Sequence, residues 1–362
     1  MIVLHIIPTL EGGGAERQLC MLATEQAGRG HGVHLAVRRT GMYADEMRQG
    51  GVRIHDLGDV RSVNPKLLFA ITRLIRTIKP AIVQTWLPQM DVLGGIAAHL
   101  TGTSWIVSER TSARYYREIP VFARIRLLLG QSASSIVANS SGGEQYWRSC
   151  ARPGLRLATI PNALDIDRIR KAGVGMSREI DSCPLLLVVG RFGSEKALDI
   201  IVRAMGKLSQ RQTSPINILM MGEGTERFRI AREIEGASLQ DRIKLLPYQS
   251  DWWKWLSVAD GLISMSRYEG NPNVVLEAMA GGCPVVLSDI PAHREIADAS
   301  SALFVPVDDA DALSAAVDHL VTDKHGALQR AGRANERVAS MTVTAMADAY
   351  DAVYNEALNG QG

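Results

Sequence analysis

The chain has 362 residues, of which 46% are hydrophobic and 22% are charged. This composition is typical of a globular protein and excludes a disordered or fibrous chain, while the length predicts two domains of ordinary size. The longest apolar runs, such as Leu185–Val189, are far shorter than the roughly 18 residues that would suggest a membrane span. The first residues, Met1–Pro8, have no basic segment and no cleavage site, so we interpret them as a strand and not as a signal peptide.

The four cysteines lie far apart and without CxxC spacing, which predicts buried thiols in a reducing cytoplasm and no zinc site. The formal net charge is only +2, but the two halves of the chain differ. Residues 1–170 hold 21 Lys and Arg against 13 Asp and Glu, whereas the remainder holds 19 against 25. A basic first half indicates either an anionic partner, such as a membrane surface, a phosphate-bearing ligand or a nucleic acid, or an accident of surface composition.

Strand-like and helix-like patterns alternate along the first half of the chain. Short apolar runs rich in β-branched residues predict strands at Ile2–Pro8, Val33–Val37, Arg53–Leu57, Ala81–Thr85, Trp105–Ser108, Ile136–Asn139 and Leu157–Ile160. Apolar residues from Leu67 to Ile78 recur at helical spacing, and Arg73, Arg76 and Lys79 lie off that face. This segment is therefore predicted to be an amphipathic helix.

A small, polar segment at Gly173–Ser177 predicts a linker, after which a second alternating series begins. Its strands are predicted at Leu185–Val189, Ile216–Met221, Ile243–Pro247, Gly261–Ser264, Pro284–Ser288 and Ala302–Val305. A last helix is predicted at Thr344–Leu358. The alternation predicts α/β architecture with two Rossmann-like, doubly wound parallel sheets that face each other across a cleft.

Open α/β sheets bind ligands at the carboxyl ends of their strands, so the loops that follow strands are the first candidates for a site. The loop after the first strand contains Gly12, Gly13 and Gly14 and leads into a helix that runs to about Ala27. Glycines let the backbone approach a ligand closely, and a helix N-terminus favours an anion. The loop does not match G-x-G-x-x-G, no Walker A pattern occurs, and a plain tight turn remains an alternative.

A second candidate loop, Gly190–Lys196, follows a strand predicted to be buried. Arg191 and Lys196 are two cations at the carboxyl end of that strand, with glycines between them, an arrangement that suits a diphosphate. A solvated basic loop is the alternative.

The third candidate segment, Ser264–Gly282, carries the most specific pattern. A strand ends near Ser264, and a Gly/Asn/Pro loop leads to a helix that begins around Asn273. Glu269 lies in the loop and Glu277 about one turn into the helix, within an apolar run where a charge is costly unless it has a partner. Carboxylates near the positive end of a helix stay ionised and accept hydrogen bonds, as sugar hydroxyls require, although ordinary helix capping is an alternative.

The spacing of Glu269 and Glu277 resembles the E-x7-E motif of retaining glycosyltransferases with the GT-B fold, and most closely that of glycosyltransferase family 4. The glycine loop after the first strand, the Ile160–Asp165 turn and the Gly190–Lys196 loop occur in the order found in that family. The resemblance spans essentially the whole chain and points to bacterial enzymes that assemble polysaccharides and lipid-linked glycans.

The resemblance implies a role for each matching residue. Glu277 would hold the ribose hydroxyls of a nucleotide-diphosphate sugar, and Glu269 would hold hydroxyls of the donor sugar. The Gly270 and Asn271 backbone would lie alongside the donor sugar. Arg191 and Lys196 would neutralise the diphosphate, helped by the Asn273 and Val274 backbone N–H groups. Gly13 and Gly14 would close on the diphosphate from the opposite domain. Fixed cations and N–H groups would stabilise charge on the leaving diphosphate. The family is thought to use a front-face substitution without a covalent glycosyl-enzyme intermediate.

The resemblance also implies the division of the chain. We expect an acceptor-side domain at residues 1–172, onto which a C-terminal helix at residues 344–362 would pack back. The nucleotide-sugar-binding domain would occupy residues 173–343. We expect a UDP-linked donor, on resemblance alone, and neither a metal nor another cofactor.

The sequence departs from the family pattern in two places. Many members carry a catalytic-site His at the end of the strand that here ends Ser108-Glu109-Arg110. We include Glu109 among the catalytic candidates and leave open whether Glu109 or Arg110 faces the cleft. Ala163 stands where glycine is usual, and the D-x-D at Asp165–Asp167 belongs to the same turn, so we interpret it as structural and not as a metal site.

The segment Arg114–Leu129 is basic, aromatic and apolar at once. Such a segment suits either an anionic membrane interface or an amphipathic helix on the core, and the basic first half favours the membrane. The resemblance adds a polyprenyl-diphosphate-linked acceptor. Trp86, Gln89 and Asp91 follow a predicted strand on the acceptor side, and we expect them to help shape the acceptor site. Nucleic-acid binding has no recognisable module here. We expect a cytoplasmic protein that binds the inner face of the cell membrane peripherally.

Other functions with the same fold remain open at this stage. A nucleotide-sugar epimerase such as a UDP-N-acetylglucosamine 2-epimerase, or a sugar phosphorylase, would have a similar architecture. Sugar transfer to an acceptor separates a transferase from an epimerase. A non-catalytic nucleotide-sugar-binding subunit is a third class, against which the intact Glu269, Glu277, Arg191 and Lys196 argue.

Overall fold

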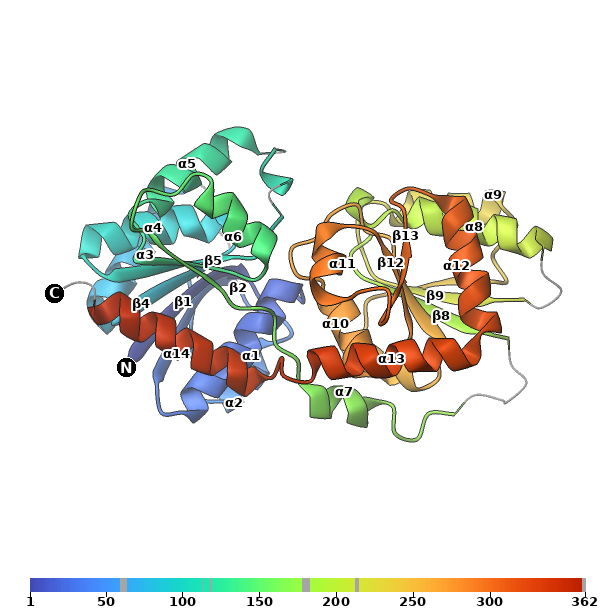
Figure 1. The fold of residues 1–362 in the computed structure, drawn as a ribbon. Coiled ribbons are helices and arrows are strands. Elements are labelled where there is room, and N and C mark those ends of the chain that lie inside the picture. Colours follow the sequence, from blue (N-terminus) through green and yellow to red (C-terminus); the bar gives the residue numbers. More distant parts are fainter. Residues whose placement is uncertain (59–63, 113, 118, 178–182, 212–214, 360–362) are drawn as a thin grey trace. The chain divides into compact units, whose positions relative to one another are not determined.

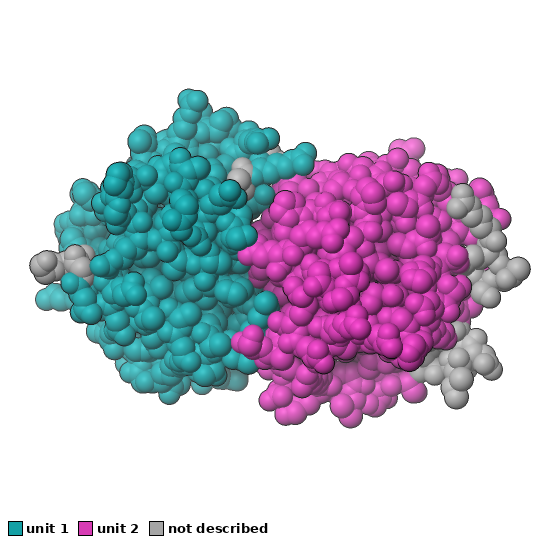
Figure 2. Space-filling model, viewed as in Figure 1, with its two compact units in different colours: residues 1–163, 341–362 teal, residues 164–340 magenta. Residues whose placement is uncertain are grey.

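The structure is a computed structural model, and it describes residues 1–58, 64–112, 114–117, 119–177, 183–211 and 215–359. By their contacts these residues form two compact units (Figure 2), of which unit 1 is Met1–Ala163 with Met341–Gly362 and unit 2 is Leu164–Ser340. The sequence prediction ended the first domain at residue 172. The helix α7 (Ile166–Ala172) groups with unit 2 because it packs against η3 (Trp252–Ser257) and α10 (Asn273–Ala280).

Unit 1 is built on a seven-stranded sheet whose order is β3-β2-β1-β4-β5-β6-β7, with every pair parallel. Its strands are β1 (Ile2–Thr9), β2 (Gly32–Arg39), β3 (Arg53–Asp56), β4 (Ile82–Trp86), β5 (Ser104–Glu109), β6 (Ser135–Ala138) and β7 (Arg156–Thr159). Its helices are α1 (Gly14–Gly28), α2 (Ala44–Gln49), α3 (Pro65–Ile78), α4 (Pro88–Thr101), η1 (Tyr115–Arg117), α5 (Pro120–Gly130), α6 (Ser141–Arg148) and α14 (Val343–Asn359).

Helices cover both faces of this sheet, as a parallel sheet requires (Figure 1). One apolar cluster joins α1, α2 and α14 to the strands, and another joins α3, α4 and α6 to them. The predicted amphipathic helix is α3, which buries Leu67, Ile71 and Ile75. It begins after Asn64, whose side chain accepts a hydrogen bond from the Lys66 backbone N–H and so satisfies one donor of the first turn.

The last helix, α14, packs against α1 within unit 1 (Figure 1). Arg29, directly after α1, donates to Asp348 at 2.6 Å and to Asp351 at 3.1 Å. Beneath these surface contacts the buried tyrosines Tyr350 and Tyr354 reach the core of the sheet. The chain therefore completes the first unit only with its last helix.

Unit 2 is built on a six-stranded parallel sheet of order β10-β9-β8-β11-β12-β13. Its strands are β8 (Leu185–Val189), β9 (Asn217–Met221), β10 (Ile243–Leu246), β11 (Gly261–Ser264), β12 (Val285–Ser288) and β13 (Leu303–Val305). Besides α7, α10 and η3, its helices are η2 (Ser194–Lys196), α8 (Leu198–Arg211), α9 (Arg227–Gly236), α11 (Pro291–Ile296), α12 (Ala310–Thr322) and α13 (Lys324–Val338).

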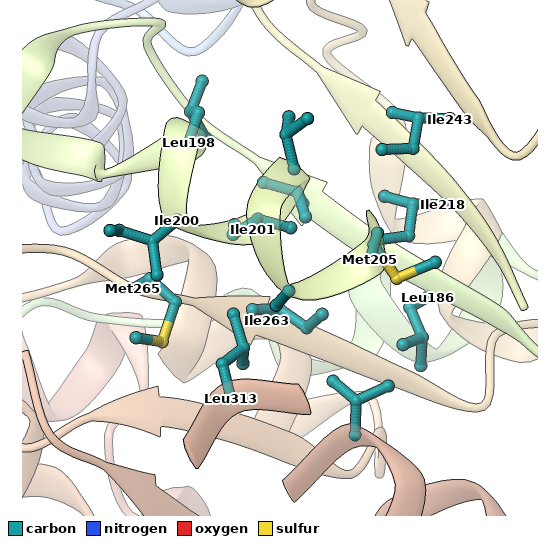
Figure 3. Close-up of a cluster of buried hydrophobic side chains, with 14 of the residues drawn as sticks. Leu186, Leu198, Ile200, Ile201, Met205, Ile218, Ile243, Ile263, Met265 and Leu313 are labelled. Carbon is teal, nitrogen blue, oxygen red and sulfur yellow. The ribbon is translucent and has the colours of Figure 1, made fainter. Parts of the chain in front are cut away.

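One apolar cluster of unit 2 packs α8, α9 and α12 against the sheet (Figure 3). Ile201 and Met205 of α8 lie among strand residues such as Ile218 and Ile263, and all four side chains are at most 4% exposed. This packing holds the start of α8, and with it the loop before it, at the carboxyl end of β8. The two sheets confirm the predicted α/β class with two doubly wound parallel sheets.

In each unit the strand order reverses beside the first strand, between β1 and β4 and between β8 and β11. Loops at such a switch point diverge to opposite sides and leave room for a ligand outside the carboxyl ends of the strands. In unit 2 these loops are the second and third candidate segments of the sequence. None of the helices in the described part of the chain is both long and apolar enough to cross a membrane.

Candidate functional site

Two loops of unit 2 meet through a charged pair at the switch point. The Lys196 ammonium contacts the Glu269 carboxylate, and Ser266 donates its hydroxyl to the same carboxylate oxygen at 2.7 Å. Lys196 follows β8 and Glu269 follows β11, and these are neighbouring strands. The Glu269 side chain is 15% exposed and that of Lys196 24%, so each keeps a face from which it can meet a ligand.

The electrostatics of this pair keep Glu269 ionised. Burial alone would raise the pKa of the Glu269 carboxyl group, but the Lys196 charge and the hydrogen bonds from Lys196 and Ser266 hold that pKa below its ordinary value. An ionised carboxylate only accepts hydrogen bonds, which suits recognition of hydroxyl groups. The arrangement therefore has the chemistry of a hydroxyl-binding carboxylate beside a cation.

The loop after β8 depends on close backbone contacts. Gly190 has φ +148° and its N–H donates to Met221 O at 3.0 Å. A Cβ on Gly222 would lie 1.8 Å from Gly190 O, so only glycine lets the loops after β8 and β9 approach this closely. Arg267 adds a cross-link, because its backbone N–H donates to Glu195 O at 2.7 Å. The Gly190–Lys196 loop is thus anchored from two neighbouring loops.

Arg191 has a different environment from Lys196. Its side chain is 73% exposed and pairs with Glu195 at 2.7 Å, four residues along the chain. The Glu195 side chain is only 12% exposed, so Arg191 lies at the surface over a largely buried carboxylate. A shallow pocket lined by Gly190, Arg191, Lys196 and Ser266 lies between the two loops.

The predicted helix after the third candidate loop is α10, which begins at Asn273 as expected. Its N-cap residue is Pro272, whose side chain makes no capping hydrogen bond, and the Val275 backbone N–H donates to Pro272 O at 3.0 Å. Glu277 is 3% exposed on this helix, and Asn271 is 9% exposed in the loop before it. Gly270 and Val274 are partly exposed beside them. The structure thus places Glu269 and Glu277 in one unit, on a loop and the helix that follows it.

Sequence reasoning missed a layer of polar residues beneath Glu269. Ser288 donates its hydroxyl to Ser266 O at 2.6 Å, which fixes the residue that holds Glu269. His293 is fully buried, and its Nδ1 lies 2.8 Å from Ser288 O. Burial is the main cause that lowers the pKa of His293, so the ring is neutral at physiological pH. Nothing in their spacing singles out these residues, because only β12 and α11 bring them under the loop.

In unit 1 the glycine loop is occupied by one of the chain's own carboxylates. Gly13 precedes α1 and Gly12 has φ +113°. A Cβ on Gly13 would lie 2.1 Å from Glu16 Oε2, because the Glu16 carboxylate folds over Gly13 and accepts a hydrogen bond from Thr9 at 3.0 Å. Burial raises the pKa of Glu16. An anion bound by Gly13 and Gly14 would have to displace this side chain.

Glu109 lies in the interior of unit 1, which does not fit the catalytic contact predicted for it. Its side chain is fully buried, and its carboxylate accepts hydrogen bonds from Arg126 at 2.8 Å, Tyr116 at 2.7 Å and Trp147 at 2.9 Å. The Thr111 backbone N–H also donates to it, at 2.9 Å. Glu109 is therefore a structural residue that holds the end of β5 and the turn after it.

Two of the candidate acceptor contacts are also buried. Asp91 is fully buried, pairs with Arg126 at 2.7 Å and accepts a hydrogen bond from Thr85 at 2.6 Å. Burial raises its pKa to about 6, against the opposing effect of Arg126. Trp86 is fully buried as well, whereas Gln89 is partly exposed, so of these three residues Gln89 is the one whose side chain reaches the surface.

Arg110, directly after β5, is the partly exposed residue of the Glu109–Arg110 pair. Its guanidinium donates to Asn162 Oδ1 at 2.8 Å and to the Tyr350 hydroxyl, and it lies over the Trp86 ring at 4.5 Å. The same side of unit 1 holds the turn with Ala163. The Ala163 backbone N–H donates to Gln18 Oε1 at 2.8 Å, and Gln18 Nε2 donates to Ala163 O at 2.9 Å. These two hydrogen bonds stabilise the turn without a glycine.

Both aspartates of the D-x-D lie at the start of α7, and Asp309 lies at the start of α12. Asp165 accepts a hydrogen bond from Arg168 N and caps α7, and Asp309 accepts one from Ala312 N and caps α12. The structural interpretation of the D-x-D at Asp165–Asp167 agrees with this geometry.

The two doubly wound sheets, with polar loops at the carboxyl edge of each, define the GT-B class of two-domain protein. Family models match in both parts: the model described as Glycosyltransferase Family 4 matches residues 12–168, and that of Glycosyl transferases group 1 matches residues 177–338. The chain belongs to this family of GT-B glycosyltransferases.

Individual relatives agree with this assignment. The lipopolysaccharide core biosynthesis glycosyltransferase LpsE of Rhizobium meliloti is 22% identical over 93% of this chain and 94% of its own length. A phosphatidyl-myo-inositol mannosyltransferase of Mycolicibacterium smegmatis is 31% identical over 49% of this chain and 46% of its own. Among solved structures, Anabaena HepE in complex with UDP-glucose superposes with a TM-score of 0.85 at 17% identity, covering 98% of this chain and 99% of its own.

Proposed function

We propose that this protein is a retaining glycosyltransferase that moves a sugar from a nucleotide-diphosphate sugar of the UDP type to a glycan or lipid-linked acceptor in bacterial polysaccharide or glycoconjugate biosynthesis. The observation that carries the proposal is the Glu269 carboxylate held by Lys196 and Ser266 at the switch point of unit 2. Glu269 would bind hydroxyls of the donor sugar, and Glu277 those of the ribose. Lys196, Arg191 and the first turn of α10 would stabilise the leaving diphosphate.

Names of similar proteins support the donor and acceptor classes. HepE was solved with UDP and with UDP-glucose. A Campylobacter jejuni relative, 24% identical over 54% of this chain and 53% of its own, is named as an N-acetylgalactosaminyltransferase acting on a diphospho-undecaprenol-linked sugar. On this basis we propose a UDP-sugar donor and a polyprenyl-diphosphate-linked acceptor, with no metal required for transfer.

The experiment that tests the function has two stages. A thermal-shift panel of UDP-, GDP- and dTDP-sugars identifies the nucleotide, and mass spectrometry then identifies products on a short polyprenyl diphosphate acceptor. We expect stabilisation by one UDP-sugar and a product heavier by one sugar residue. Epimerisation of the nucleotide-sugar without an acceptor would contradict the proposal.

Replacing Glu277 with Ala should weaken binding of UDP by about 1–3 kcal/mol, because one hydrogen-bonded carboxylate partner of the ribose is lost. Isothermal titration calorimetry with UDP measures the change. Glu336→Ala, which removes an exposed carboxylate from α13, is the matched control and should leave the affinity unchanged. Equal affinities for the wild type and Glu277→Ala would refute the ribose assignment.

We also propose that α5 contacts an anionic membrane surface. Val121, Ile125 and Leu128 of this helix are 71%, 43% and 74% exposed, and their spacing places them on one helical face. Arg114, Arg117 and Arg124 are exposed near them. Exposed aliphatic side chains beside arginines suit the interface of an anionic bilayer. Within the predicted segment Arg114–Leu129, Glu118 lies outside the described residues.

The double substitution Val121→Ser and Leu128→Ser should lower the partitioning of the protein onto anionic liposomes by about tenfold or more, since two aliphatic side chains no longer leave water. Flotation at low and high salt measures the bound fraction. Phe228→Ser is the matched control, because Phe228 is 76% exposed on α9 of unit 2. Wild-type binding that is absent or insensitive to salt would disprove membrane contact through this helix.

A further inference from the structure

Two buried or half-buried arginines of unit 1 have opposite electrostatic environments. Arg126 is 2% exposed and is neutralised by two carboxylates, Asp91 and Glu109. Arg110 is partly exposed, and none of the carboxylates in the described ranges pairs with it. Its two bonded nitrogens donate to neutral oxygens of Asn162 and Tyr350. The charge of Arg110 is therefore held in place without being neutralised.

The neighbours of Arg110 fix both the plane and the direction of its guanidinium. The Trp86 ring lies 4.5 Å beneath the guanidinium carbon, and Trp86 is itself held by a hydrogen bond of 3.2 Å to His5 Nδ1. Burial lowers the pKa of His5 to about 4, so this support carries no competing charge at neutral pH. Fixing a planar guanidinium in advance reduces the entropy lost when it binds an anion.

The hydroxyl that Arg110 contacts comes from the far end of the chain. Tyr350 lies on α14, is fully buried, and is 240 residues away from Arg110 in sequence. A guanidinium has five N–H donors in a geometry that matches phosphate, and the partners described for Arg110 use only part of this set. Its position directly after β5 places it at the ligand-binding edge of the sheet.

We propose that Arg110 is a phosphate-binding residue of unit 1 and that Tyr350 on α14 is the residue that positions it. Under the proposed function, on which the identity of the substrates rests, the phosphate belongs either to the nucleotide-sugar or to a diphosphate-linked acceptor. The C-terminal helix then contributes to the site through Tyr350, in addition to stabilising the unit.

The binding test uses the full chain and inorganic pyrophosphate as the probe, with affinity measured by isothermal titration calorimetry. Arg110→Ala should weaken binding by about tenfold or more, since a charge-assisted contact is lost, and Arg110→Lys should recover part of it. Tyr350→Phe should weaken binding about two- to fivefold, and should have no further effect in the Arg110→Ala background. The same substitutions of Arg110 and Tyr350 are then measured in a Lys196→Ala background. Because Lys196 lies in unit 2, this comparison separates pyrophosphate binding by unit 1 from binding by unit 2.

Tyr354→Phe is the matched control for Tyr350→Phe. Tyr354 lies one turn further along α14, is equally buried, and bonds to Gln84 and Gln26 instead of Arg110. Its loss should lower the thermal midpoint without changing pyrophosphate affinity. If the role of Tyr350 is purely structural, Tyr350→Phe should behave like Tyr354→Phe, with a lower thermal midpoint and unchanged pyrophosphate affinity. Affinity that is independent of Arg110 in both backgrounds would overturn the proposal.

Steady-state kinetics then assign the source of the phosphate. A raised KM for the nucleotide-sugar in Arg110→Ala indicates the donor, a raised KM for the acceptor indicates the acceptor, and unchanged KM and kcat would refute the assignment. If the wild type transfers no sugar but still shows Arg110-dependent pyrophosphate binding, the proposed function fails and the assignment of Arg110 stands.

Discussion

Under the proposed function, replacing Glu269 with Gln should lower the transfer rate by about 100- to 1,000-fold while the protein stays folded, because the site loses the charge that we propose binds the donor sugar. The substitution keeps the shape of the side chain, and the amide can still accept from Ser266, which donates to Glu269 at 2.7 Å. It removes the negative charge that pairs with Lys196. Initial rates at saturating donor and acceptor measure the effect on kcat.

The matched control for this prediction is Glu223→Gln. Glu223 follows β9 in the same unit, its side chain is 60% exposed, and its nearest ion-pair contact with Arg227 is long, at 3.8 Å. This variant should retain the full rate. A Glu269→Gln enzyme as active as the wild type would remove Glu269 from the catalytic site.

Replacing Arg126 with Ala should destabilise unit 1 by about 3–5 kcal/mol, because Asp91 and Glu109 would be left buried without their common cation. The guanidinium also packs against the rings of Tyr116 and Trp147, each with a centroid 5.0 Å away, and these contacts would be lost too. Urea unfolding followed by circular dichroism and tryptophan fluorescence measures the change.

Arg124→Ala is the control for Arg126→Ala, since Arg124 is exposed on the same helix and its loss should change stability by less than about 0.5 kcal/mol. Adding Asp91→Asn and Glu109→Gln to an Arg126→Met chain should recover part of the loss, because the uncompensated charges are then removed. A cost below about 1 kcal/mol for Arg126→Ala would show that water reaches the two carboxylates in the folded state.

The sequence by itself determined the α/β class, the position of every strand in the two sheets, and the loops at the carboxyl ends of those strands. These features are local, since strand and helix patterns depend on residues a few positions apart. The pairing of Lys196 with Glu269 could also be anticipated, because both residues follow strands that a doubly wound sheet places side by side.

Only the tertiary structure decided which of two adjacent charged residues is buried. Glu109 and Arg110 are neighbours on the chain, but side chains along a strand alternate between faces, and Glu109 points to the face where Arg126 and Trp147 lie. Arg110 is held by Tyr350, which is 240 residues away. Contacts of such long range follow from the packing of α14 on unit 1, and no local pattern contains that information.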